Sequence, residues 1–311
     1  MKRTYELWPI TSSRPCVKLI TGPRIWRVVD GKLGVGEEMA IGEIALPTGF
    51  TSEHAAMLAR YLSDEARLDR RQWGLVWDGV DMLRHATVTV GEETQTFARL
   101  YDERIDQVHA DAFLEALYQF EDLVRQAERE RAAIARQIVD DLRETGYYDP
   151  ARPETQVLLV FCLYWWQSFS KGYAFEVEIL RDLAASGVVH EAHDLRNRQA
   201  RLTSFDLTLM GFRGDIKTST YFFGVERGRG LPHDFYLTRL WDPQAHRWHR
   251  VAILKPEVWA AMDGGTRPAP LEQVLEILPD AAEIQVDTQR LVVVDYERWK
   301  EQVKARQQKR G

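Results

Sequence analysis

From Glu92 to Thr145 the chain contains neither glycine nor proline. Because these two residues mark most turns and helix ends, a run of this length without them favours helix. A solvated helix face explains its charged stretch at 128–133, and a partner or self-association surface is the alternative. The pattern predicts a long amphipathic helix, or a helical hairpin, over about residues 105–145. The apolar residues that recur at intervals of three or four, as one face of a helix requires, are Phe113, Leu117, Phe120, Val124, Ala127, Ile134, Ile138 and Leu142.

The sequence after this segment suggests a chain of two parts. Gly146 can end a helix in the left-handed conformation, and the connector YYDPARP follows at 147–153. Residues 1–50 are rich in Val, Ile, Thr and Gly and predict short strands and hairpins. We therefore expect an α+β N-terminal region over 1–150, with a recognition, regulatory or oligomerisation role, and a second domain over 151–311.

Composition excludes several classes of protein. The 45% hydrophobic and 28% charged content of the 311 residues argues against wholesale disorder. The two cysteines, Cys16 and Cys162, are too few for a disulfide scaffold, a four-cysteine zinc site or a cysteine-ligated cluster, and they suit a reducing cytoplasm. The longest apolar run, at 157–166, is far shorter than the roughly 20 residues of a membrane span. We expect a cytoplasmic protein with neither a signal peptide nor a membrane segment.

The order of the expected elements indicates an α/β core in the second domain. Helical patterns alternate there with strand patterns, and the last strand is followed by a C-terminal helix. The expected elements are helices at 155–168 and 171–187, a strand at 188–195, two strands joined by a tight turn within 204–223, a hairpin at 235–254, and a final strand and helix within 291–310. Ahead of them we expect a helix from Thr51 or Ser52 to about Ala66 and a strand at 87–90.

The tripeptide Asp215-Ile216-Lys217 places a carboxylate and an ammonium on one face of a strand, because residues i and i+2 point to the same side. Asp206 lies in the preceding strand, and a turn at 211–214 would fold that strand back and bring Asp206 near Asp215. Two converging carboxylates suit Mg²⁺. The other acidic-x-Lys tripeptide, Asp30-Gly31-Lys32, sits on an Asp-Gly turn and is interpreted as structural.

Glu176 is the third candidate acid. It shares a helical stripe with Leu180 and Leu183, so it lies at the edge of an inward-facing apolar surface. A carboxylate in that position needs a partner, and a metal site would supply one. Glu178 points elsewhere and is the weaker candidate.

A helix carrying G-x-x-x-E, a strand with an aspartate and a strand with (D/E)-x-K together resemble the PD-(D/E)xK, restriction-endonuclease-like nucleases. The segment KGYAFEVEILRDLAASG is similar to the opening helix of archaeal Holliday junction resolvases. The resemblance covers about residues 170–222. It implies a central mixed sheet flanked by helices and a Mg²⁺-dependent phosphodiesterase site, with Mn²⁺ as a substitute. Glu176, Asp206 and Asp215 would be its metal ligands, and Lys217 would serve the attacking water.

The resemblance and the added N-terminal region favour a DNA endonuclease of restriction or anti-phage defence. The alternatives are a repair or recombination nuclease on branched DNA, and a catalytically inactive nuclease-like subunit that binds nucleic acid. Nucleases of this kind often dimerise to cut both strands. We therefore expect double-stranded DNA as substrate, with either a homodimer or a complex with a defence-system partner.

The net charge of −6 is unevenly distributed. Residues 1–150 carry 19 basic and 26 acidic side chains, whereas residues 196–229 carry seven basic and three acidic ones. The net positive charge of the second segment suits binding to a phosphate backbone. The candidate nucleic-acid-binding residues there are Arg196, Arg198, Arg201, Arg213, Arg227 and Arg229.

Two further sequence patterns give weaker indications of function. The glycine-rich segment at 31–42 lacks the lysine position of a phosphate loop. The HEAH segment at 190–193 lacks the spacing that places two histidines on one helical face, which argues against a zinc hydrolase and leaves contact with substrate as the alternative.

Overall fold

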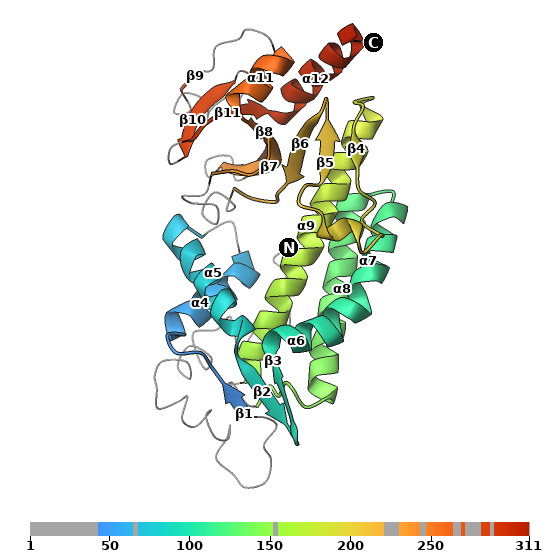
Figure 1. The fold of residues 1–311 in the computed structure, drawn as a ribbon. Coiled ribbons are helices and arrows are strands. Elements are labelled where there is room, and N and C mark those ends of the chain that lie inside the picture. The colour runs from blue at the N-terminus through green and yellow to red at the C-terminus, as the bar shows by residue number, and fades with distance from the viewer. Residues whose placement is uncertain are drawn as a thin grey trace. The chain divides into compact units, whose positions relative to one another are not determined.

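The computed structural model describes residues 43–64, 68–151, 155–220, 230–242, 247–263, 269–270, 281–286 and 289–310. Two compact units divide between Ser170 and Lys171. The helices and strands of each unit are coloured along the chain in Figure 1. The predictions for residues 1–42, together with Arg227 and Arg229, lie outside the described residues.

The described part of the first unit combines a small sheet with helices. Its antiparallel sheet has the order β1-β2-β3, and Ile44 of β1 is paired with Val88 of β2. The strand predicted at 87–90 is confirmed as β2. The elements are β1 (Glu43–Ala45), α4 (Ser52–Asp64), α5 (Arg70–Arg84), β2 (Thr87–Val90), β3 (Glu93–Thr96), α6 (Phe97–Tyr101), the π-helical turn η2 (Asp102–Asp106), α7 (Gln107–Gln119) and α8 (Leu123–Glu144).

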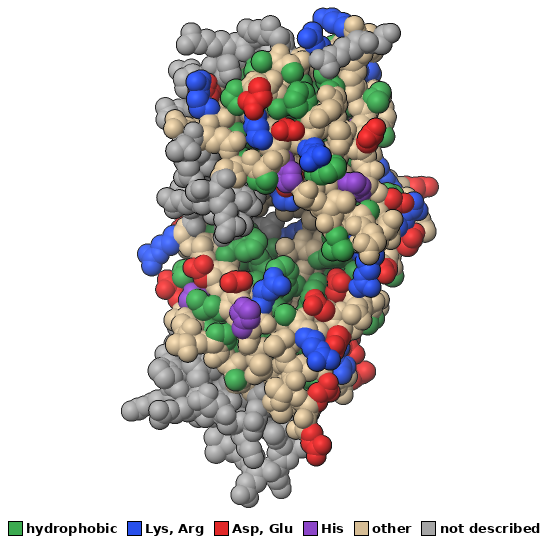
Figure 2. Space-filling model, viewed as in Figure 1, with side chains coloured by type: hydrophobic (Ala, Val, Ile, Leu, Met, Phe, Trp, Pro, Cys, Tyr) green, Lys and Arg blue, Asp and Glu red, His purple; other side chains and the backbone are tan. Residues whose placement is uncertain are grey.

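The glycine-free run forms two main helices, not one. α7 ends where Phe120 adopts an extended conformation, and Asp122 caps the start of α8, because its side chain accepts a hydrogen bond from the backbone N–H of Arg125. An aspartate cap therefore breaks the helix without glycine or proline. On the face drawn in Figure 2, side chains of both charge signs are interspersed over this helical region, as a solvated surface requires.

Helix α5 has no counterpart in the prediction, because Gly74 and Gly79 lower the helix propensity of its sequence. A Cβ at Gly79 would lie 3.0 Å from Cβ of His54. The glycine thus allows α4 and α5 to approach closely. A capping box at Asp69 and Gln72 begins α5.

Helix α9 (Gln156–Ala185) is one continuous helix of 30 residues, where the sequence predicted two. It contributes residues to both units, so the division falls inside it, whereas the predicted boundary is the connector before it. Gly187 ends the helix with φ 73°, and the N–H groups of Gly187 and Val188 bond to Ala184 and Leu183, a Schellman motif. Among the described residues, no helix is long and apolar enough to cross a membrane.

The second unit contains a mixed sheet of eight strands in the order β4-β5-β6-β7-β8-β11-β10-β9. β6 and β7 run parallel, as do β9 and β10, and the other neighbours are antiparallel. This confirms the expected α/β class with a central mixed sheet flanked by helices. The elements are β4 (Glu191–Ala192), the 3₁₀ turn η4 (Ala200–Leu202), β5 (Leu207–Leu209), β6 (Phe212–Ile216), β7 (Phe235–Asp242), β8 (Arg247–Leu254), α11 (Pro256–Asp263), β9 (Ala269–Pro270), β10 (Ala282–Val286), β11 (Gln289–Asp295) and α12 (Tyr296–Arg310).

One face of this sheet packs against helices. Phe175, Ile179 and Leu183 of α9 join buried residues of α11, α12 and the central strands in one apolar core. α11 and α12 lie side by side on the sheet (Figure 1). The strand predicted at 188–195 shortens to the two residues of β4.

The turn between β5 and β6 lies at Met210 and Gly211, not at 211–214 as predicted. Both residues have positive φ, 53° and 86°, which suits a tight two-residue hairpin turn. Gly214 instead lies inside β6, where a Cβ would come within 2.2 Å of the Phe235 ring. The aromatic ring occupies the space that the missing side chain leaves.

Candidate functional site

The β5–β6 hairpin brings two of the predicted acids together. The backbone N–H of Asp206 donates to the carbonyl of Gly214 at 3.0 Å, which aligns Asp206 with the residue before Asp215. Oδ2 of Asp206 accepts a hydrogen bond of 2.6 Å from the backbone N–H of Ile216. The carboxyl group of Asp206 therefore reaches across the hairpin to the strand that carries Asp215.

Lys217 follows β6 and extends its pairing with β7. Its backbone N–H donates to the carbonyl of Leu237 at 2.9 Å. Ile216 belongs to the apolar core, so Asp215 and Lys217, which alternate with it, point the other way. The Lys217 ammonium lies 2.5 Å from Oδ1 of Asp215, as the spacing of the tripeptide predicted.

Glu176 lies on α9 and is only 6% exposed. Its Oε1 atom has no hydrogen-bond partner within the part of the chain that the structure describes. Burial, the neighbouring Asp206 and, more weakly, Asp215 raise its pKa to about 9, although Lys217 opposes the shift. Glu176 is therefore held next to both aspartates in an environment that disfavours its charge.

Burial and the neighbouring charges also shift the pKa values of Asp206 and Lys217. Burial and Asp215 raise the pKa of Asp206 to about 7, although Lys217 and the Ile216 N–H lower it. Burial lowers the pKa of Lys217, but the three carboxyl groups outweigh burial and raise it overall. The site thus holds three carboxyl groups against one ammonium, and an additional cation would relieve the imbalance.

The donor set fits a divalent metal by its chemistry. Carboxylate oxygens are the ligands that Mg²⁺ prefers, and the unpartnered oxygen of Glu176 is an available donor. Among the described residues, no group of three or more His, Cys, Asp or Glu side chains is arranged around a common metal position. In this arrangement the Lys217 ammonium supplies the positive charge at Asp215.

His233 belongs to this site and was not identified from the sequence. Its Nε2 lies 3.8 Å from Oδ2 of Asp215, on the oxygen that Lys217 does not contact, and its side chain is 12% exposed. Burial lowers the pKa of His233, and Asp215 partly offsets this. The parallel pairing of Gly214 with Phe235 places His233 there, and parallel pairing leaves no local signal in sequence.

The predicted nucleic-acid-binding arginines that the structure describes have different surroundings. Arg196 forms a two-point contact with Asp194, at 2.7 Å for the shorter pair. Arg198 is exposed and Arg201 is half-buried. The guanidinium of Arg213 lies over the ring of Phe205, 5.2 Å from its centroid.

The remaining polar candidates contact other residues. Glu178 pairs with Arg250 at 3.5 Å. His190 bonds the carbonyl of Val188 at 2.9 Å, and the ring of His193 packs against Phe205 at 5.2 Å.

Comparison with known proteins found no relative of this chain. No protein-family model, no curated protein and no solved structure matches the chain.

Proposed function

We propose that this protein is a metal-dependent nuclease with a restriction-endonuclease-like core that hydrolyses phosphodiester bonds of DNA. The observation that carries the proposal is the convergence of Glu176, Asp206, Asp215 and Lys217 from one helix and one hairpin. Structural ion pairs also perturb pKa values, but they rarely leave three carboxyl groups beside a single cation. An excess of acid at a buried point is what a metal-dependent phosphodiesterase requires.

Asp206, Asp215 and Glu176 would hold Mg²⁺, or Mn²⁺ in its place. When bound, such an ion neutralises phosphoryl oxygens, lowers the pKa of a coordinated water and stabilises the leaving oxygen. The Ile216 N–H holds the Asp206 carboxylate in place, and burial of Asp215 keeps that group fixed. Lys217 has a partly exposed side chain that can orient the attacking water and stabilise negative charge on the phosphate.

His233 lies on the other side of Asp215. There it would orient Asp215 from the oxygen that Lys217 leaves available, and it would limit the access of water to that side. The net positive charge of residues 196–229 suits the binding of a phosphate backbone next to the site. Double-stranded DNA, a role in restriction or anti-phage defence, and action as a homodimer or with a defence-system partner complete the proposal.

The direct test is plasmid cleavage by the purified protein with Mg²⁺ or Mn²⁺. Asp215→Asn and Lys217→Met should each lower the cleavage rate at least about 100-fold, since each removes a group that acts on the transition state. Glu191→Gln is the matched control, because Glu191 is an exposed carboxylate of β4 at the same edge of the sheet. It should cleave at the wild-type rate.

The outcomes separate the candidate functions. A wild-type protein that binds DNA but does not cut it with either metal would overturn the enzyme proposal and favour a non-catalytic nucleic-acid-binding subunit. Cleavage of four-way junctions in preference to linear duplex would favour a repair or recombination nuclease. Loss of cleavage only at temperatures where the variants unfold would indicate a structural ion pair.

A further inference from the structure

Two arginines face each other across the β7–β8 hairpin. Arg239 is directly paired with Arg250 in the register of the two strands. Like charges in directly opposite positions destabilise a sheet, so the pair needs compensating contacts. Departures from local rules of this kind concentrate at functional sites.

Arg239 finds its contacts on two elements that carry site residues. Its Nε donates a hydrogen bond of 2.6 Å to the carbonyl of Thr218, the residue after Lys217. Its guanidinium lies 5.6 Å from the ring centroid of Phe175, the residue before Glu176 on α9. The ring of Trp248, at 4.5 Å, stacks on the same guanidinium and limits its motion.

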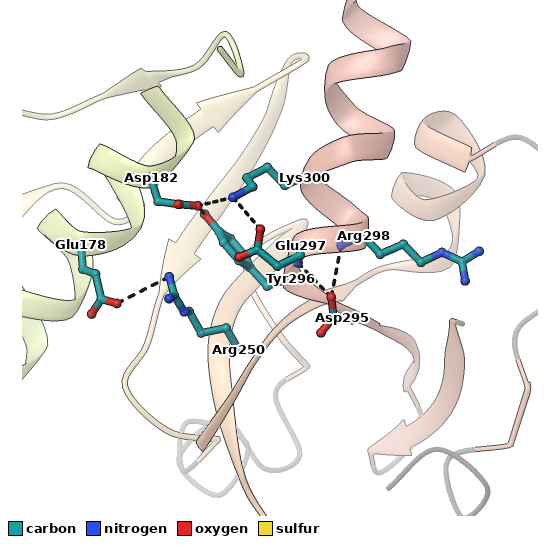
Figure 3. A network of polar contacts seen from close by, with 8 residues as sticks. All are labelled: Glu178, Asp182, Arg250, Asp295, Tyr296, Glu297, Arg298 and Lys300. Carbon is teal, nitrogen blue, oxygen red and sulfur yellow. Dashed lines mark hydrogen bonds and ion pairs between the residues drawn. The ribbon is translucent and has the colours of Figure 1, made fainter. Parts of the chain in front are cut away.

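Arg250 contacts the same helix two residues after Glu176. Its guanidinium lies 3.5 Å from Oε1 of Glu178 and 5.7 Å from the ring centroid of Tyr296. Figure 3 shows Arg250 reaching from β8 toward Glu178 on α9, with Tyr296 beside it. The two arginines therefore contact α9 immediately before and shortly after Glu176.

We infer that Arg239 is a positioning residue of the candidate site, an inference that rests on the proposed nuclease function. It connects the chain segment of Lys217 to the helix of Glu176, two elements that come from distant parts of the sequence. Through Thr218 and Phe175 it sets the separation between the ammonium and the carboxyl group. It acts through these neighbours and does not contact the nucleic acid.

The test uses Arg239→Lys, which keeps the positive charge and removes the planar guanidinium and its Nε donor. At saturating Mg²⁺ we expect kcat for plasmid cleavage to fall about 10- to 100-fold, because small displacements of catalytic groups have effects of that size. KM for DNA should stay within about twofold of the wild type, since no binding contact is lost. Hydrogen exchange of a peptide covering residues 213–220 should become faster, a readout that does not depend on cleavage.

Arg247→Ala is the matched control. Arg247 is exposed on the same hairpin and bonds to His249, so its removal changes the charge of β8 but not the site. We expect wild-type kcat, KM and exchange for this variant.

Three results would overturn the inference. Wild-type kcat in Arg239→Lys would show that charge alone suffices, and a raised KM with unchanged kcat would identify Arg239 as a nucleic-acid contact. Unchanged exchange of 213–220 with a lower melting temperature would indicate a structural role elsewhere in the hairpin. Failure of the proposed function looks different, because the wild-type protein itself would then not cleave.

Discussion

The ammonium of Lys217 lies 2.5 Å from Oδ1 of Asp215, and the two side chains differ sharply in exposure: 43% for Lys217 and 7% for Asp215. The lysine side chain therefore borders solvent, whereas the aspartate is enclosed by its surroundings. A partly exposed cation beside a buried carboxylate is an arrangement in which a metal ion can take over the role of the lysine as the counter-charge. This relationship leads to the first prediction.

Replacing Lys217 by Met should lower the melting temperature in the absence of metal, because the carboxyl groups lose the ammonium beside them. It should also increase the stabilisation that Mg²⁺ or Mn²⁺ provides, since the metal then supplies the missing charge. An ion at 100 times its Kd stabilises a folded protein by about 2.7 kcal/mol. Thermal melting with and without metal measures both effects. Lys304→Met on α12 is the control, and an equal metal response in both variants would contradict the prediction.

The second prediction concerns the pH dependence of stability. Burial raises the pKa of Glu176 to about 9, above its usual value, so between these two pH values the folded protein binds more protons than the unfolded chain. Without metal, this group lowers the free energy of unfolding as pH rises through that range, by at most about 1.4 kcal/mol per pH unit.

Glu176→Gln should remove this contribution and melt at a higher temperature than the wild type at pH 8, while losing cleavage activity. Chemical denaturation from pH 5 to pH 9 with chelator present measures the slope. Parallel curves for the two proteins would show that Glu176 is charged in the folded state.

The third prediction uses a pair of glycines. Gly214→Ala would place a Cβ 2.2 Å from the Phe235 ring, so we expect a loss of about 1–3 kcal/mol in the free energy of unfolding. Gly172→Ala is the matched variant: it lies in α9 with open space around its Cβ position, and should gain up to about 1 kcal/mol from helix propensity.

Urea denaturation of both variants measures these changes. The double variant Gly214→Ala with Phe235→Leu should recover part of the loss, because the smaller side chain vacates the space. Additive losses in the double variant would contradict the steric explanation.

The fourth prediction concerns the network in Figure 3, where Asp182 on α9 accepts hydrogen bonds from Lys300 at 2.6 Å and from Tyr296 at 2.9 Å. Burial raises the pKa of Asp182, but these hydrogen bonds outweigh burial and lower it overall. Its contribution to stability is therefore present above the usual aspartate pKa and is lost as pH falls through the lower, folded value.

A double-mutant cycle with Asp182→Asn and Lys300→Met should give a coupling of about 0.5–2 kcal/mol at pH 7. The coupling should approach zero as the pH falls through the lowered pKa of folded Asp182, because the carboxyl group is then protonated. A coupling that does not change with pH would show that the contact acts through packing and not through charge.

Local sequence patterns predicted many of the helices and strands of the second unit. Alternation and turn residues predicted the β5–β6 and β7–β8 hairpins, the last strand and α12, and the structure has all of them. The turn position was wrong because Met210, a residue that seldom adopts positive φ, occupies it with Gly211. Helix α5 was missed because Gly74 and Gly79 lower its helix propensity, although Gly79 serves the close packing against α4.

The residue order alone was enough to predict which groups are available to the site: Asp206, Asp215 and Lys217 lie on adjacent segments of one hairpin, so their proximity follows from short-range geometry. The surroundings of these groups depend on contacts that form in the folded protein. The burial of Glu176 beside both aspartates, the approach of His233 and the contacts of Arg239 all depend on how α9 and β7 pack against that hairpin. Such contacts join residues far apart in the chain, and their energies arise from burial and charge that exist only after the sheet has formed.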